Sequence, residues 1–108
     1  MKNAVLINLR AVRETDARNH LTGPLGRIRL PRLQPGERET LVADTQEHTL
    51  FTVQGTGTAV TGSATVPLHH GVALTLPLGS SVTVEAGTDG LEVFIASLDT
   101  PQRSADAS

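Results

Sequence analysis

Short runs of β-branched and aliphatic residues, interrupted every few positions by glycine or proline, are the feature that most constrains this chain. The pattern is clearest over residues 36–55 and 71–86. Short strands must reverse direction often, and glycine supplies the backbone conformations that tight turns and bulges need. Proline marks strand ends, because it cannot donate to a central ladder. No segment has the pattern of a long helix, so the sequence predicts an all-β barrel or sandwich.

The positions of these glycines and prolines predict where the strands and turns lie. Strands are expected at 4–9, 27–33, 39–43, 48–54, 58–62, 63–67, 72–76, 81–85 and 91–98. Hairpin turns are expected at 44–47 and around 62–63, and a further turn at 77–80. The polar stretch 10–26 is expected to be loop with a short helical turn near 12–18. Pro31 indicates an edge strand or a bulge in 27–33.

The length of 108 residues predicts one domain. We expect it to cover residues 1–99, including an N-terminal strand. Residues 100–108, TPQRSADAS, have almost no apolar side chain and are expected to form a disordered tail. A small domain with an apolar terminal strand gains from a shared interface. The sequence therefore predicts a homodimer joined through residues 4–9 and an outer sheet face.

Composition excludes several functions. The net charge of -2 gives no electrostatic basis for binding nucleic acid. The absence of cysteine rules out disulfides and thiolate metal sites and fits a reducing cytoplasm. The apolar run at the N-terminus is too short to cross a membrane and lacks the features of a signal peptide. We expect a cytoplasmic protein with no nucleic-acid or membrane partner.

The first stretch resembles the first motif of the cupin family, G(X)5HXH(X)3,4E(X)6G. Gly36 and Gly55 occupy the two glycine positions with the required spacing. Val42 and Asp44 stand at the two histidine positions, and His48 stands at the glutamate position. The glycine spacing is therefore kept, whereas the metal-ligand residues are replaced.

The second stretch resembles the second cupin motif, G(X)5PXG(X)2H(X)3N. Gly71, Pro77 and Gly79 match it, while Val82 stands at the histidine position and Ala86 at the asparagine position. The resemblance covers roughly residues 27–98. It implies a cupin-type double-stranded β-helix, that is, a jelly-roll barrel. It also implies a bacterial protein whose first strand pairs across a dimer.

In cupins the ligand positions of both motifs point into the barrel. If this chain is like the family, those positions face a common interior, and strand alternation adds neighbours to the same face. The residues expected there are Val42, Asp44, His48, Leu50, Thr52, Val82 and Val84. Such an interior is mostly apolar with few polar groups, which suits a small organic ligand or substrate.

The ligand positions argue against a metal. Only Asp44 and His48 carry metal-binding atoms there, whereas iron and zinc sites usually need three or more protein ligands. His69 and His70 precede the second motif in a loop, and a tandem pair in extended chain points to opposite faces. His20 lies outside both motifs. We therefore expect no metal and no other cofactor.

Asp44 and His48 form a candidate catalytic pair, because a carboxylate can orient an imidazole for general acid or base catalysis. The alternative is that Asp44 caps the turn at Thr45 and Gln46, with His48 a partly exposed strand residue. The sequence offers no cysteine, no serine in a nucleophile elbow and no phosphate-binding loop.

Three functions are consistent with these observations. The first is a small cupin that binds an organic molecule in its barrel; the resemblance allows metal-independent isomerisation, cyclisation or dehydration in bacterial biosynthesis. The second is a non-catalytic ligand-binding or sensing cupin. The third is a metal-dependent cupin dioxygenase with unorthodox ligands. The sequence alone does not decide whether the protein is an enzyme.

Overall fold

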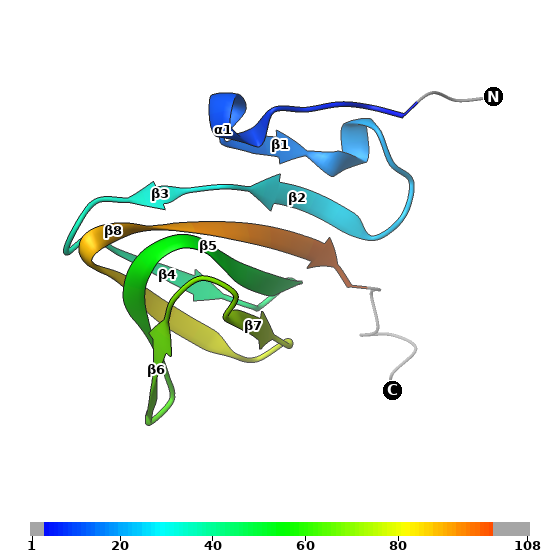
Figure 1. Ribbon diagram of the computed structural model, residues 1–108. Helices are drawn as coiled ribbons and strands as arrows, with labels where there is room; N and C mark the ends of the chain where they lie inside the picture. Colours follow the sequence, from blue (N-terminus) through cyan, green and yellow to red (C-terminus); the bar gives the residue numbers. More distant parts are fainter. Residues whose placement is uncertain (1–3, 101–108) are drawn as a thin grey trace, which may run out of the picture.

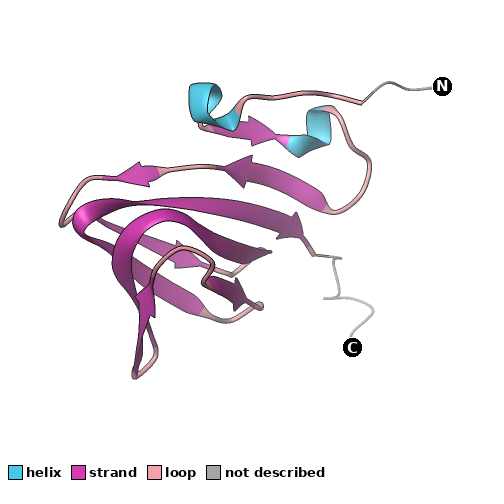
Figure 2. Ribbon diagram, viewed as in Figure 1, coloured by secondary structure: helices cyan, strands magenta, loops and turns pink. Residues whose placement is uncertain are grey.

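The structure is a computed structural model that describes residues 4–100, and nearly all of its regular structure is β-sheet (Figures 1 and 2). The elements in chain order are α1 (Leu9–Val12), β1 (Glu14–Asp16), the 3-10 helix η1 (Ala17–Asn19), β2 (Leu25–Arg29), β3 (Arg32–Leu33), β4 (Arg38–Val42), β5 (Gln46–Thr61), β6 (Ala64–Leu68), β7 (Ala73–Leu76) and β8 (Ser81–Asp99). The tail expected at 100–108 lies, apart from Thr100, outside the described residues. The all-β prediction is confirmed.

Two long bent strands, β5 and β8, hold the other strands together. The sheet runs β1-β2-β8-β5-β6, with β3 and β4 added to β8 and β7 added to β5. The first half of β5 pairs with the end of β8, and the second half pairs with its beginning. Because both strands curl over (Figure 1), the sheet folds onto itself into two facing layers without closing.

Bulges in β5 produce this bend. The register to β8 shifts between Thr52 and Gln54 and again between Gly55 and Gly57. Gly55 has φ +87°, and a Cβ there would collide with the carbonyl oxygen of Gly90. The sequence predicted a strand end at Gly55, whereas β5 runs through it. The same correction applies to β8, which continues across residues 87–90.

The expected strand at 4–9 is wrong. Residues 4–8 are irregular, and α1 begins at Leu9. The Asn8 side chain accepts hydrogen bonds from the N–H groups of Arg10 and Ala11, at 3.1 and 3.3 Å. Asparagine is a preferred helix N-cap, so Asn8 ends the extended segment where the apolar pattern alone suggested that it continues.

The expected hairpin at 44–47 is also wrong. β4 pairs with β8, from Arg38 opposite Glu85 to Val42 opposite Ser81, whereas β5 pairs with β6, β7 and β8. The segment from Ala43 to Thr45 therefore crosses between layers. The hairpin around 62–63 is confirmed, with Thr61 opposite Ala64.

The core lies between the two layers and is almost entirely aliphatic. Its buried members are Leu41, Ala43, Leu50, Ala59, Leu68, Leu76, Val82, Val84, Ala86, Leu91, Val93 and Ile95. Thr52 is also fully buried, and its hydroxyl has no hydrogen-bond partner. Side chains from both layers thus fill the space in which cupin chemistry was expected.

Gly55 and Gly71 provide a matched test of the bend. Both have positive φ, but a Cβ at Gly71 would meet open space. Gly71→Ala should lower the free energy of unfolding by about 1 kcal/mol from backbone strain alone. Gly55→Ala should cost roughly 2 kcal/mol more, because strand pairing with Gly90 must also shift. Urea denaturation measures both, and equal losses would contradict this account of the bend.

Candidate functional site

Five of the expected interior residues lie in the core. His48, Leu50 and Thr52 alternate along β5 with their side chains buried, at 9%, 1% and 0% exposure. Val82 and Val84 are buried near the start of β8, in the facing layer. Period-two alternation along each strand accounts for this placement.

Val42 and Asp44 do not face this interior, contrary to the expectation. Val42 is 54% exposed, and Asp44 is exposed as well. The register of β4 sets Leu41 opposite Val82, so Leu41 and Ala43 take the core face instead. A shift of one residue turns a strand's side chains to the other face, and motif spacing alone does not settle which residues turn inward.

The expected pairing of Asp44 with His48 is wrong. Asp44 Oδ1 accepts a hydrogen bond from the Thr45 N–H at 2.8 Å, as the turn-capping alternative expected, but His48 is buried and not partly exposed as that alternative had it. The His48 ring is held by other groups: Nδ1 lies 2.8 Å from Ser97 Oγ and Nε2 lies 3.2 Å from the Val42 carbonyl oxygen. No carboxylate takes part in these two contacts.

The contact with the Val42 carbonyl shows which nitrogen of the His48 ring donates. A carbonyl oxygen only accepts, so Nε2 carries the proton in this contact. In the neutral ring Nδ1 is then an acceptor, and the Ser97 hydroxyl donates to it. Both ring nitrogens are thus satisfied inside the protein, and Ser97 is only 3% exposed. This arrangement ties β5, β8 and the end of β4 together.

Ser97 was not identified from the sequence. It continues the buried alternation of Val93 and Ile95 on β8, and it is the polar member of that series. A serine at an interior position of an aliphatic strand was the available signal, because a buried hydroxyl usually has a hydrogen-bond partner.

The barrel interior has no room for an organic molecule in this structure. The cavity there has a volume of about 10 Å³ and is lined by Leu33, Glu39, Leu41, Leu50, Val84, Val93 and Ile95. That volume is at most the space of a single water molecule, and the lining is largely aliphatic. The pocket expected inside the barrel is therefore not formed.

The cupin metal does not fit the residues present. Within residues 4–100, no three histidine, aspartate or glutamate side chains gather where they could hold a metal ion. His48 has both ring nitrogens engaged, Asp44 is exposed and bonds the Thr45 N–H, and Val82 has no donor atom. His69 and His70 are exposed, and the His70 ring lies edge-on to Phe51 with centroids 6.4 Å apart.

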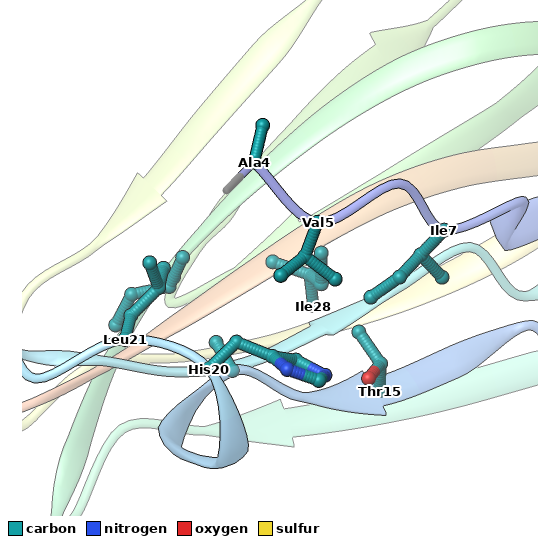
Figure 3. Close-up of a pocket in the computed structure, with 9 residues that line it drawn as sticks. Ala4, Val5, Ile7, Thr15, His20, Leu21 and Ile28 are labelled. Atoms are coloured by element: carbon teal, nitrogen blue, oxygen red, sulfur yellow. The ribbon is translucent and has the colours of Figure 1, made fainter. Parts of the chain in front are cut away.

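A larger apolar space lies outside the barrel. A groove of about 320 Å³ runs between the N-terminal segment 4–7 and the layer formed by β1, η1 and β2 (Figure 3). We call it the N-terminal groove; its lining residues are Ala4, Val5, Ile7, Thr15, Ala17, His20, Leu21, Leu25 and Ile28. The sequence patterns did not reveal it, because they predicted a strand at residues 4–9 and a loop at 10–26.

Only two polar side chains line the N-terminal groove. His20 comes directly after η1, and its ring points along the groove toward Thr15 on β1 (Figure 3). Neither phenylalanine lines the groove. The walls are therefore aliphatic, and the neighbouring imidazole of His20 and hydroxyl of Thr15 are the side-chain groups that could orient a ligand.

A second, polar cleft of about 400 Å³ lies near Arg18, Arg27 and Asp99. Its charges already have partners: Arg18 pairs with Asp16 at 2.9 Å, and Arg27 pairs with Glu14 at 3.4 Å. Hydrogen bonds from Arg18 lower the pKa of Asp16 to about 2. This compensation leaves the cleft without a clear charge preference for a ligand.

A buried carboxylate holds the N-terminal segment to the barrel. Glu92 on β8 has a side chain only 6% exposed and accepts hydrogen bonds from Arg10 at 2.9 Å and from Arg13 at 2.8 Å. Burial raises the pKa of Glu92, but the hydrogen bonds and charges of Arg13 and Arg10 outweigh it and hold the pKa below its ordinary value. Arg32 of β3 lies opposite Glu92 in the strand register.

Neither a family model nor a curated protein matches this sequence, but solved structures do. A cupin 2 conserved barrel domain protein from Salinispora arenicola superposes with a TM-score of 0.72 at 18% identity, over 91% of this chain and 92% of that one. A cupin protein from Bacteroides fragilis gives 0.69 at 15% identity, over 82% and 76%. A predicted oxalate decarboxylase from Thermotoga maritima gives 0.66 at 16% identity, over 88% and 76%.

These superpositions show the fold: the chain folds as these cupin structures do, and this is the fold that the two motifs implied. Two further similar structures are longer, and the chain spans 52% and 64% of their lengths. In the described part of the chain, no helix is long and apolar enough to cross a membrane.

The contact between His48 and Ser97 can be tested by stability. Ser97→Ala removes the hydrogen-bond partner of a buried ring nitrogen and should lower the free energy of unfolding by about 1–3 kcal/mol. Ser81→Ala is the control, because Ser81 is an exposed serine on the same strand; it should change stability by less than about 0.5 kcal/mol. Equal effects in urea denaturation would show that the buried hydrogen bond contributes nothing.

Proposed function

We propose that this protein is a small ligand-binding cupin that holds an organic molecule in the N-terminal groove, outside the barrel. One contrast carries the proposal. The groove offers about 320 Å³ of apolar space, whereas the barrel cavity offers about 10 Å³. Small-molecule sites usually begin near 300 Å³ and combine apolar walls with a few polar groups. The lack of cysteine fits a reducing compartment such as the cytoplasm.

The lining suggests the ligand's chemistry. Aliphatic walls without an aromatic ring suit an aliphatic or alicyclic body better than a flat aromatic one. His20 and Thr15 lie side by side and provide hydrogen bonds for a single polar head, such as a carboxylate or a hydroxyl. Decanoate has both features and is a suitable probe.

A metal-independent enzyme is the second candidate. The observation that favours it is the pairing of His48 Nδ1 with Ser97 Oγ, because Nδ1 would be the base that takes the proton of the Ser97 hydroxyl. A substrate would then have to reach a ring that is 9% exposed, through a corner closed by Val42. Ligand binding in the N-terminal groove needs no such opening, and the structure therefore favours it over catalysis at His48.

Substitutions at Leu21 and Leu78 distinguish binding in the groove from unspecific adsorption to exposed apolar side chains. Leu21 lines the groove at 51% exposure, while Leu78 is 45% exposed and lies outside it. Leu21→Glu places a charge in the apolar wall and should weaken decanoate binding by roughly tenfold or more, because burying an unpaired charge is costly. Leu78→Glu should leave the affinity unchanged.

Isothermal titration calorimetry measures both affinities. His48→Gln in the same titration tests the second candidate, because groove binding does not involve the barrel histidine. Decanoate binding that is lost in His48→Gln but kept in Leu21→Glu would move the site into the barrel and contradict the proposal.

We further propose that the protein forms a homodimer through the outer side of the N-terminal segment. Leu6 is 98% exposed, and Val5 and Val12 nearby are each 55% exposed. Leu6 is not among the groove's lining residues, whereas its neighbours Val5 and Ile7 are. Exposed apolar side chains that gather in one short segment are typical of an interaction surface.

Leu6→Glu should therefore convert a dimer of about twice 11.4 kDa into a monomer at micromolar concentration, because the interface would bury an unpaired charge. Light scattering reports the mass, and Val60→Glu is the control, because Val60 is an exposed aliphatic residue on β5. A monomeric wild-type protein would remove the dimer proposal but leave groove binding untouched.

A further inference from the structure

The N-terminal groove has one wall without regular structure of its own. Residues 4–8 form no strand or helix, yet Ala4, Val5 and Ile7 line the groove. The opposite wall belongs to β1, η1 and β2, and its strands pair with the main sheet. The shape of the groove therefore depends on the contacts that hold the segment 4–8 in place.

Contacts that hold this segment begin where it enters α1. Arg10 lies on α1, and Arg13 is its C-cap. Both side chains reach the same carboxylate, Glu92, one to each oxygen. We call this set the Glu92 clamp. It joins positions 82 and 79 residues apart in the sequence, and its acceptor side chain is almost completely buried.

The backbone conformation of Arg13 indicates that the contacts of the clamp hold this residue in place. Its φ is +68°, and it is the only non-glycine residue with positive φ among those described. This conformation is unfavourable for a side chain with a Cβ and persists where surrounding contacts impose it. Here the Arg13 carbonyl accepts from the Leu30 N–H at 2.7 Å, and its guanidinium donates to the Leu30 carbonyl as well as to Glu92.

We propose that Glu92 is a positioning residue for the N-terminal groove: by holding Arg10 and Arg13 it fixes α1 and the segment before it over β1 and β2, and thereby sets the affinity for ligand. This inference rests on the proposed function for its effect on binding. Glu92 does not line the groove, so its influence passes through the clamp. Losing one clamp residue would free the wall and leave β1, β2 and the barrel intact.

Glu92→Gln tests the clamp, with Glu85→Gln as the matched control. Glu85 lies on the same strand and pairs with Arg38 at 3.3 Å in an exposed ion pair away from α1. Hydrogen exchange of the ligand-free protein should show residues 9–13 exchanging about tenfold faster or more in Glu92→Gln, while barrel amides such as those of Leu50 and Ile95 keep their protection. Glu85→Gln should match the wild type.

The decanoate affinity is the second readout. We expect Glu92→Gln to weaken it by about tenfold and Glu85→Gln to leave it unchanged. If Glu92→Gln loses barrel protection as well, Arg10→Gln replaces it, because the Arg10 side chain is 59% exposed and its change spares the core. Arg10→Lys, which keeps a charge able to reach Glu92, should retain most of the affinity.

The outcomes separate the two proposals. If the exchange rates at residues 9–13 are unchanged in both Glu92→Gln and Arg10→Gln, Glu92 does not hold the segment, whatever the protein binds. Faster exchange with unchanged affinity also overturns the inference, because the wall would then not control binding. If the wild-type protein binds no decanoate, the proposed ligand class fails, and the exchange data alone decide whether Glu92 holds the segment.

Discussion

The pairing of β5 with β8 is the interaction on which the rest of the structure depends. Every other strand of the sheet except β1 attaches directly to one of these two, and β1 reaches them through β2. The bulges near Gly55 bend β5 while it stays paired, so the same two strands build both layers. Aliphatic side chains from the two halves then meet and fill the interior, and this leaves the N-terminal layer as the place where an apolar space remains open.

The filled interior explains why the cupin fold is present without its metal-ligand set. His48 occupies a ligand position, yet Ser97 and the Val42 carbonyl satisfy both of its ring nitrogens. Along β4 and the two residues after it, the side chains that turn inward are Leu41 and Ala43, one position away from those expected, and Asp44 lies outside. His48 therefore joins strands within the core. Another buried polar residue, Glu92, bonds Arg10 and Arg13 and so attaches the N-terminal segment to β8.

Much of the fold was predictable because glycine spacing and strand alternation are local properties. They identified the all-β architecture and, together with the resemblance to the cupin motifs, the buried faces at Leu50, Thr52, Val82 and Val84. The site was not predictable, because it depends on non-local facts. Whether Asp44 points inward is decided by the register of β4 on β8. The N-terminal wall of the groove ends at the Asn8 cap, and in our proposal it is held by the hydrogen bonds of Arg10 and Arg13 to Glu92. No local sequence motif predicts the register of β4 on β8 or the pairing of Glu92 with Arg10 and Arg13, because both depend on residues far apart in the chain.

The three isoleucines allow one measurement of the central claim, which is that ligand binds outside the filled barrel. Ile7 and Ile28 line opposite walls of the N-terminal groove, whereas Ile95 is buried in the barrel at 1% exposure. A methyl NMR spectrum of isoleucine-labelled protein, titrated with decanoate, reports all three at once. We predict saturable shifts at Ile7 and Ile28 with Ile95 unmoved. A shift confined to Ile95 would place the ligand in the barrel and contradict the claim.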